Sequence, residues 1–404
     1  YTDFLEYAGS FQKTLREIFN WNSSSDYWFP EIRSMSGAIL VMSCVLYPYV
    51  YMMTRASFLT VPVSFYQTSL IYGRNSFFSV ALPLARPGIF AGLALVLMET
   101  ISDFGTVEYF ALETLTLGVF NVWLGMNSLS GASQISSVLF IFVVILLTVE
   151  YLARRRQRFH ELSSGQNILI SENLSNSKKL ICFLICFIPI FLGFIVPVII
   201  LLDFVVSGFA IINFAEIFQT ALTSITVATA GAFFVMISSV LLILISNYKS
   251  NNFHKIIIFL ASCGYALPGT ILAVGIVIFV GWLNNLINFH LSYVAGGFIV
   301  LIFAYVTRFL AVGNAAIRSG ILKVHPNAMD ASKSMGIGFY QSIRKIILPL
   351  IFTNVLIGGI LVFVDILKEL PITLLLRPFN FETLSTYVYQ YASDDLLQES
   401  SFAA

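Results

Sequence analysis

Eight apolar stretches recur along this chain of 404 residues, and each is long enough to cross a lipid bilayer as one helix. Only 11% of the residues are charged and 58% are hydrophobic, which excludes a soluble cytosolic enzyme. The stretches do not alternate between polar and apolar residues, as the strands of an outer-membrane barrel would. The sequence therefore predicts an all-α polytopic membrane bundle, with spans near 35–54, 87–103, 134–152, 180–202, 220–246, 256–282, 292–312 and 350–370.

The loops between these stretches differ in positive charge. Alternate loops on one side hold 16 lysine and arginine residues, whereas the loops on the other side hold 4. Because cytoplasmic loops retain Lys and Arg, the richer group is predicted to be cytoplasmic. The formal net charge of +1 gives no support for a nucleic-acid partner, and membrane lipid is the expected surroundings. The predicted cytoplasmic loops are 55–86, 153–179, 247–255 and 313–349.

Two similar segments indicate an internal repeat. Leu82-Pro83 and Leu348-Pro349 each end a basic loop and begin an apolar stretch. Sixteen and twenty residues after each proline stand acidic side chains, and this shared spacing favours a duplicated unit over a chance match. The acids are Glu99 and Asp103 in the first segment, and Asp365 and Glu369 in the second.

The repeat divides the chain into a first transmembrane repeat at 1–152, a cytoplasmic linker at 153–179 and a second repeat at 180–404. Four apolar stretches precede the second Leu-Pro pair, whereas one precedes the first. The second repeat also stops where the counterpart of the 134–152 span would begin. The comparison predicts that the chain is clipped at both ends and belongs to a protein of about twelve spans, three of them missing from the first repeat.

One predicted cytoplasmic loop carries a motif. It contains the run Asp330-Ala331-Ser332-Lys333-Ser334-Met335-Gly336, with Pro349 thirteen residues beyond the glycine. This pattern resembles the EAA loop of ABC importer permeases. The resemblance implies a short helix that docks on an ATPase subunit and couples its movement to the spans, with Asp330 at the Glu position and Ala331 and Ser332 at the small ones. Gly336 would end this helix and Pro349 would begin the next span. The alternative is an ordinary basic loop between two spans.

The corresponding loop of the first repeat departs from this pattern. Its residues are Gln67-Thr68-Ser69-Leu70-Ile71-Tyr72-Gly73. Gln67 replaces the acid, and Gly73 lies ten rather than thirteen residues before Pro83. Its predicted coupling role therefore rests on its position in the repeat rather than on its motif.

Four further segments, at 27–33, 46–51, 98–110 and 368–384, are similar to ferric-iron permeases of the same family. This resemblance covers essentially the whole chain and implies two fused copies of the type I importer fold in a bacterial inner membrane. It also implies a periplasmic ferric-iron-binding protein and a cytoplasmic ABC ATPase dimer as partners, with Fe(III) as the transported ion. Fused permeases for thiamine, phosphonates or sulfate share the architecture, so these cargoes remain alternatives.

The chain contains no Gly-x-x-x-x-Gly-Lys-Ser/Thr phosphate-binding loop. ATP and Mg²⁺ are therefore expected on the partner ATPase, and no cofactor is expected in this chain. No nucleophile, base and orienting acid stand at recognisable spacings either. The chain is thus predicted to be a transport subunit rather than an enzyme.

The four repeated acids are the candidates for the substrate path: Glu99, Asp103, Asp365 and Glu369. Within each pair the acids are four residues apart, and they share one helical face if the helix is unbroken. An intramembrane carboxylate costs about 2.5 kcal/mol or more unless it faces water, a partner or an ion. Carboxylate oxygen suits a hard cation such as Fe(III), although no permanent metal site is predicted. The alternative is that the acids cap helix ends or pair with Lys368.

The run Ala266-Leu267-Pro268-Gly269 stands inside the predicted span 256–282. Because proline removes a backbone hydrogen bond and clashes with the preceding turn, the sequence predicts a kink there.

Two other functional classes remain open. An ion-coupled secondary transporter would use intramembrane acids to carry protons or sodium. A membrane scaffold that transports nothing would not need them. The EAA-like loop favours the ABC permease over both.

Overall fold

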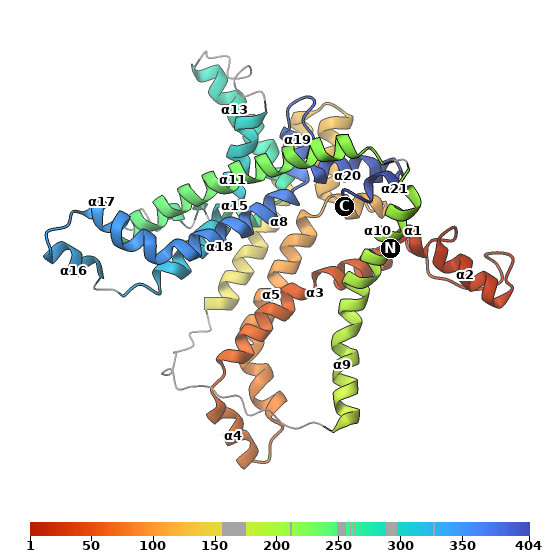
Figure 1. The fold of residues 1–404 in the computed structure, drawn as a ribbon, viewed down its shortest axis with the longest axis horizontal. Helices are drawn as coiled ribbons and strands as arrows, with labels where there is room; N and C mark the ends of the chain where they lie inside the picture. The colour runs from red at the N-terminus through yellow and green to blue at the C-terminus, as the bar shows by residue number, and fades with distance from the viewer. Residues whose placement is uncertain are drawn as a thin grey trace. The chain divides into compact units, whose positions relative to one another are not determined.

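The computed structural model is built of helices (Figure 1). It describes residues 1–155, 175–210, 212–248, 256–258, 260–261, 263–287, 297–325 and 328–404. Every regular element in these ranges is a helix, so the predicted all-α membrane bundle is confirmed. Residues 156–174 of the predicted linker lie outside the described residues, and the assignment of that linker stays a prediction.

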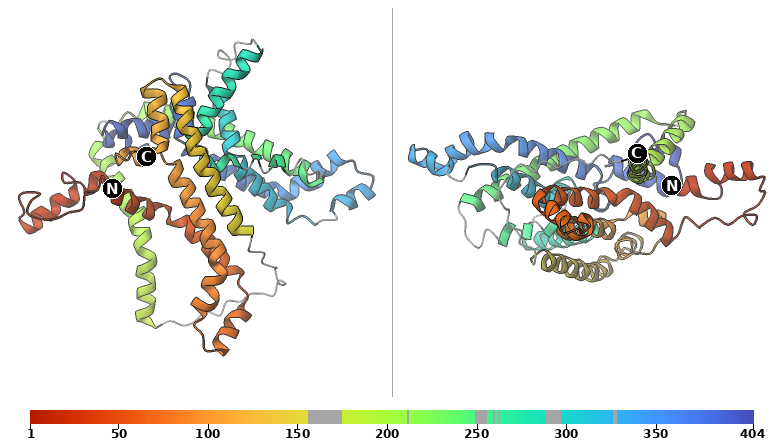
Figure 2. Two further views of the ribbon diagram at one scale, coloured as in Figure 1. Left: turned by 180° about the vertical axis from the view of Figure 1, so that it is seen from behind. Right: turned by 90° about the horizontal axis from the view of Figure 1, so that it is seen from below.

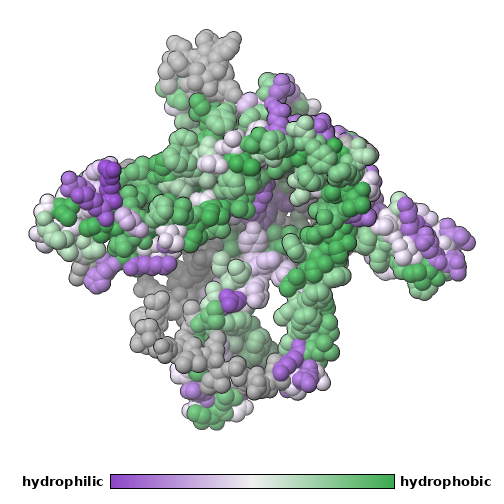
Figure 3. Space-filling view, in the orientation of Figure 1, coloured by the Kyte–Doolittle hydropathy of each residue, from purple (hydrophilic) through white to green (hydrophobic). Residues whose placement is uncertain are grey.

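Eight helices in the described ranges are long and apolar enough to cross a membrane, which is the number that the sequence predicts. A helix meets this requirement because it satisfies every backbone hydrogen bond internally in the absence of water. Apolar side chains cover most of α9 (Asn176–Ile190), which has no buried residue (Figure 3). The eight spans are Met35–Leu59, Phe77–Ser102, Leu129–Thr148, Asn176–Gly208, Phe214–Ser246, Gly269–Leu286, Phe298–Ile321 and Phe339–Leu367.

The described residues form two compact units. The first contains Tyr1–Leu117 and Val138–Val206, and the second contains Gly118–Ser137 and Ser207–Ala404. These units are defined by packing, whereas the predicted repeats are defined along the chain. Each repeat gives a segment to the unit formed mainly by the other, so the repeat boundaries themselves stay a prediction.

The first unit is organised around α3 and α5, which pack against each other. Gly88 and Gly92 on α5 make this close approach possible: a methyl group added to Gly92 would lie 2.6 Å from the Cα atom of Val50 on α3. The elements of this unit are α1 (Thr2–Leu5), α2 (Ser10–Phe19), α3 (Met35–Thr60), α4 (Val63–Ile71), η1 (Phe77–Ala81), α5 (Leu82–Ser102), α6 (Gly105–Tyr109), α9 and η3 (Phe191–Ile195).

Three helices form the core of the second unit: α11 (Phe214–Tyr248), α15 (Phe298–Ile321) and α18 (Leu348–Leu367). Figure 2 shows them side by side. Their contact surface buries Tyr305 and Phe309 of α15 and Ile351 and Val362 of α18. The other elements of this unit are η2 (Asn121–Gly125), η4 (Cys263–Ala266), α13 (Gly269–Ile287), α16 (Ala328–Ser334), α17 (Phe339–Ser342), η5 (Ile343–Ile347), α19 (Pro371–Leu376), α20 (Leu384–Ser393) and α21 (Leu397–Ser400).

Three further helices each contain a boundary between the two units along the chain: α7 (Leu115–Phe120), α8 (Leu129–Arg155) and α10 (Val196–Gly208).

Three long helices accommodate an internal proline in the same way. A five-residue π-turn, η1, η3 or η5, ends two residues before Pro83, Pro197 or Pro349. A proline ring clashes with the carbonyl oxygen four residues earlier, and a π-turn widens the helix at this point because its hydrogen bonds reach back five residues. The two Leu-Pro landmarks of the repeat therefore have the same local structure.

The predicted span 256–282 is interrupted rather than kinked. The short turn η4 ends at Ala266, and α13 begins anew at Gly269, so no single helix continues across Pro268. Proline cannot donate the hydrogen bond that would join the two parts. The span that crosses the membrane by length is Gly269–Leu286, and at the predicted kink the structure has a break between two helices.

The contact between α3 and α5 makes a testable prediction. Replacing Gly92→Ala should lower the unfolding temperature of the purified protein in detergent, because overpacking of a tight contact typically costs about 1–3 kcal/mol. The matched control is Gly275→Ala in α13, where an added methyl group meets nothing within 4 Å. Since alanine is the better helix former, that control should leave the unfolding temperature unchanged or raise it. Equal effects of the two substitutions would contradict the close approach.

Candidate functional site

The loop that resembles the EAA motif contains a short helix, α16, where the sequence predicts one. Gly336 follows it with a φ angle of +75°, a left-handed conformation that favours glycine. The N–H group of Ile337 donates to the carbonyl oxygen of Ser332 at 3.1 Å and closes the helix end. Ala331 is exposed, and Asp330 lies in α16 with a side chain outside the described part.

The buried side of α16 is held by a hydrogen bond between two hydroxyl groups. Ser332 is fully buried and donates to the Oγ atom of Ser342 at 2.7 Å. Ser342 donates onward to the carbonyl oxygen of Gly338 at 3.0 Å. Pro349 stands in the first turn of α18, beyond the π-turn η5, as the motif requires.

The first-repeat loop has the same construction in spite of its weaker motif. Its short helix is α4, Gly73 has a φ angle of +63°, and the N–H group of Arg74 donates to the carbonyl oxygen of Ser69 at 3.0 Å. The Oγ atoms of Ser69 and Ser76 are 2.7 Å apart. Gln67 is exposed on α4, and Pro83 opens α5. The coupling role of both loops stays a prediction.

The first acid pair lies at the end of α5. Glu99 is in the last turn of this helix, but the helix ends at Ser102, so Asp103 does not share a helical face with it. Asp103 instead caps α6, because its carboxylate accepts hydrogen bonds from Thr106 Oγ1 at 2.9 Å and from the N–H group of Val107 at 3.1 Å. The pKa of Asp103 is raised above its usual value, because burial outweighs the lowering effect of these hydrogen bonds and the nearby charge of Glu99 adds to the rise.

The second acid pair also spans a helix end, since α18 stops at Leu367. Asp365 is on the helix and forms a 3.0 Å ion pair with Lys368. Glu369 lies beyond the end and accepts a 3.3 Å hydrogen bond from the N–H group of Ile372 in α19. The condition of an unbroken helix is therefore not met in either repeat, and the two acids of a pair do not share a helical face. Capping and pairing, the alternative considered for these acids, account for the contacts of three of them.

Glu369 has a second partner that the sequence analysis missed. Its Oε1 atom is 3.4 Å from Nη1 of Arg308, and the side chains are 6% and 10% exposed. Arg308 is in the middle of the span α15, and its Nε and Nη1 atoms make no hydrogen bond among the described residues. A single arginine within an apolar stretch is itself a signal of a buried partner, and it could have revealed this site.

The interrupted span packs against this ion pair. A methyl group added to Gly269, the first residue of α13, would lie 2.5 Å from Nη1 of Arg308 and 2.7 Å from Oε1 of Glu369. The positive end of the α13 dipole is thus close to the Glu369 carboxylate. Irregular backbone inside a membrane protein is tolerated where neighbouring groups satisfy it. The break at Pro268 and the buried charges form one structural site.

The hydroxyl groups around Glu369 hold its backbone. Thr373 Oγ1 donates to the Glu369 carbonyl oxygen at 2.7 Å, and Ser385 Oγ donates to the same atom at 3.1 Å. The Tyr305 hydroxyl and Thr373 Oγ1 are 2.6 Å apart. This network joins α15, α19 and α20 at the end of α18, so Glu369 is firmly positioned.

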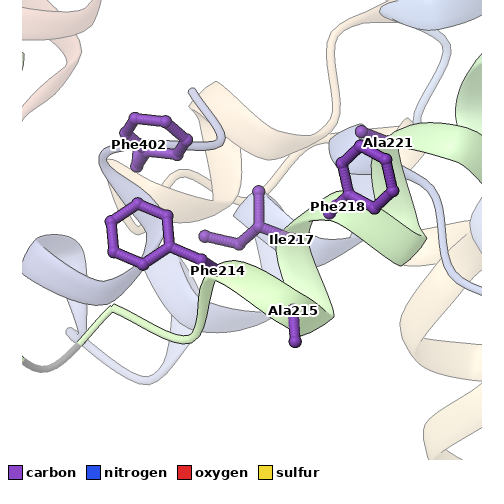
Figure 4. Close-up of a pocket in the computed structure, with 6 residues that line it drawn as sticks. All are labelled: Phe214, Ala215, Ile217, Phe218, Ala221 and Phe402. Carbon is purple, nitrogen blue, oxygen red and sulfur yellow. The ribbon is translucent and has the colours of Figure 1, made fainter.

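An apolar hollow lies elsewhere in the second unit. Figure 4 shows the ring of Phe402 facing that of Phe214, with Phe218 and Ala221 further along α11. The lining side chains are all apolar: Phe214, Ala215, Ile217, Phe218, Ala221 and Phe402. Such a lining offers no ligand to an ion. Within the described ranges, no group of three or more His, Cys, Asp or Glu side chains is arranged to hold a metal.

The chain is similar to transport proteins. Residues 26–163 match the family described as the inner membrane component of binding-protein-dependent transport systems. The Fe(3+)-transport system permease protein FbpB 2 of Haemophilus influenzae is 24% identical over 370 residues, which are 89% of this chain and 71% of that protein. The molybdenum transport system permease protein ModB of the same species is 29% identical over 139 residues, which are 31% of this chain and 59% of that protein.

The ion pair of Arg308 and Glu369 makes a prediction about stability. Glu369→Gln keeps an oxygen for the Ile372 N–H group but leaves the Arg308 charge uncompensated, which should destabilise the protein by about 3–5 kcal/mol. The double variant Arg308→Met with Glu369→Gln removes both charges and should recover most of this loss in thermal unfolding.

The control for that measurement is Lys368→Met, which breaks the pair with Asp365. Because the Lys368 side chain is 52% exposed, this change should have an effect below about 1 kcal/mol. A double variant no more stable than Glu369→Gln alone would show that the two charges do not compensate each other.

Proposed function

We propose that this chain, a multi-pass inner-membrane permease of the binding-protein-dependent ABC importer class, carries ferric iron into the cytoplasm. A periplasmic binding protein delivers the ion, and the permease passes it by alternating access. A separate ATPase dimer supplies the energy through the loops that contain α4 and α16. The chain itself is a transport subunit rather than an enzyme.

The observation that carries the iron assignment is the extent of the similarity. The ferric-iron permease matches 89% of this chain, through both repeats, whereas the molybdenum permease matches 31%. The acids support the same assignment, because carboxylates at the path of a hard cation are its natural transient ligands. Loop geometry supports coupling to an ATPase, since both repeats present a short helix ended by a left-handed glycine.

An oxyanion is the second candidate cargo. The similarity to a molybdenum permease favours it, and so does the buried guanidinium group of Arg308. The Glu369 carboxylate already lies against that guanidinium group, however, and would have to leave before an anion could bind there. Thiamine, phosphonates and sulfate are tested as further cargoes.

The first test of this proposal is uptake into vesicles. Full-length permease is reconstituted with its ATPase, and each cargo is supplied on its own binding protein: iron-55, molybdate, sulfate, a phosphonate or thiamine. ATP-dependent accumulation of iron alone is expected. ATP-dependent uptake of a different cargo would remove the iron assignment and keep the class. Uptake that continues without the ATPase would instead identify a secondary transporter, and no uptake of any cargo would favour a scaffold.

A second test concerns Glu99 and Asp365, two of the candidate acids of the substrate path. Glu99→Gln and Asp365→Asn should each lower ATP-dependent iron uptake about tenfold, since removing a charge that stabilises the passing ion by about 1.4 kcal/mol has this effect. Neither change should alter the unfolding temperature by more than a surface substitution would.

The matched control for the acidic path is Glu113→Gln, an exposed acid of the same predicted outer side. It should transport iron normally. Wild-type uptake in both path variants would show that these acids only cap and pair.

A further inference from the structure

We infer that a serine–serine hydrogen bond in each repeat is the joint that transmits movement of the short cytoplasmic helix to the following span. In the first repeat the pair is Ser69 and Ser76, and in the second it is Ser332 and Ser342. We call these two pairs the serine clasps. This inference rests on the proposed coupling to an ATPase, and it assigns the serines as positioning residues rather than as contacts with the partner.

The two clasps have the same spacing to the left-handed glycine and to the proline. The first serine of each pair lies four residues before the left-handed glycine, Gly73 or Gly336, and the second lies seven residues before the proline. The two loops differ by three residues in length, and this difference lies entirely between the glycine and the second serine. Because the length changes only between these positions, the spacing of the first serine to the glycine and of the second serine to the proline is the constrained part of the loop.

Burial distinguishes three of the four clasp serines from their neighbours, and Ser76 is half-buried. Ser332 and Ser342 are fully buried, and Ser69 is 6% exposed. Ser69 donates to the carbonyl oxygen of Tyr66 at 2.8 Å, so the hydroxyl of Ser76 is the donor within the first pair. In the second pair Ser332 is the donor. The two oxygen atoms are therefore 2.7 Å apart in both pairs, but the second serine donates in the first repeat and the first serine donates in the second.

The second serine of each pair stands at the start of the span. Ser76 directly precedes the π-turn η1, and Ser342 directly precedes η5. Between the short helix and this point, the backbone passes through the left-handed glycine and, in the second repeat, through α17 as well. The clasp links the two ends of that segment by a side-chain contact, and so a displacement of α4 or α16 reaches α5 or α18 directly.

The free end of each short helix is suited to a protein partner. Tyr72 is 77% exposed and Met335 is 68% exposed, and each directly precedes the glycine. Large apolar side chains at an exposed tip are typical of residues that enter a pocket in another protein. The clasp thus lies on the buried side of a helix whose tip is open to a partner.

The test uses the vesicle system described above, with full-length permease in which the native cysteines Cys44, Cys182, Cys186 and Cys263 are replaced by serine or alanine. The measured quantity is cargo transported per ATP hydrolysed. Ser332→Ala should lower this ratio about tenfold, because loss of one buried hydrogen bond of about 1.4 kcal/mol shifts the population of the coupled geometry by that factor. The control, Ser393→Ala, changes an exposed serine at the end of α20, outside both coupling loops, and should leave the ratio unchanged.

A reversible covalent link separates coupling from folding. The double variant Ser332→Cys with Ser342→Cys should be poorly coupled when reduced, should regain most of the transport ratio when a mild oxidant forms the disulfide, and should lose it again with reductant. The pair Ser69→Cys with Ser76→Cys should behave in the same way in the first repeat. A role in folding alone would not respond reversibly to redox state.

The outcomes are distinct. If the parent protein transports no cargo with ATP, the proposed function fails. If the parent transports and Ser332→Ala keeps the parental ratio, or if the disulfide forms without restoring the ratio, the clasp inference fails and the proposed function stands. Failure of the cysteine pair to crosslink in the folded protein would also overturn the clasp, because its two oxygen atoms lie 2.7 Å apart.

Discussion

The hydrocarbon core of a membrane offers no water to a backbone N–H or C=O group, and this constraint explains most of the local structure of the chain. The spans are helices because helices satisfy these groups internally. Where proline prevents a helical hydrogen bond, the chain widens into a π-turn, as before Pro83 and Pro349, or it breaks, as at Pro268. Where α5 and α18 end, a carboxylate caps the helix that follows. Asp103 and Glu369 serve this purpose at equivalent places in the two repeats.

The buried ion pair of the second unit follows from the same constraint. Arg308 stands in a span, where an isolated charge is costly, and Glu369 compensates it. The break at Pro268 leaves room for the pair, since Gly269 has no side chain that would displace either charge. A substitution that removed the break, the glycine or the ion pair would therefore affect the other two. Such an interdependent site explains why proline, glycine and arginine occur together in otherwise apolar surroundings.

Sequence alone predicted the features that depend on composition and spacing. The eight spans and the two Leu-Pro pairs follow from hydropathy and spacing, whereas the short helix before Gly336 was implied by the resemblance to the EAA loop. The break at Pro268 was predicted only as a kink, because local preferences do not reveal how a neighbouring helix is packed. The partnership of Arg308 with Glu369 links residues that are distant in the chain, so no periodicity could reveal it.

The serine clasps show a different limit of sequence reasoning. Serine is common in loops, and neither Ser76 nor Ser342 belongs to the motif, so a single copy carries no signal. Two copies could have revealed the pairing, because both serines keep their distances from the glycine and the proline although the loops differ in length. The motif itself contains the glycine and the proline, whose spacing differs by three residues between the repeats, but it does not contain both of the serines that flank this difference.

The paired acids differ between the two repeats in a way that bears on the proposed path. In the second repeat, Lys368 pairs with Asp365 and Arg308 pairs with Glu369, so basic side chains offset both carboxylates. In the first repeat, Asp103 is held by a hydroxyl group and a backbone N–H group, and burial raises its pKa in spite of these hydrogen bonds. Under the proposed function, the acid just beyond the helix end is therefore held by neutral donors in the first repeat and by a basic side chain in the second.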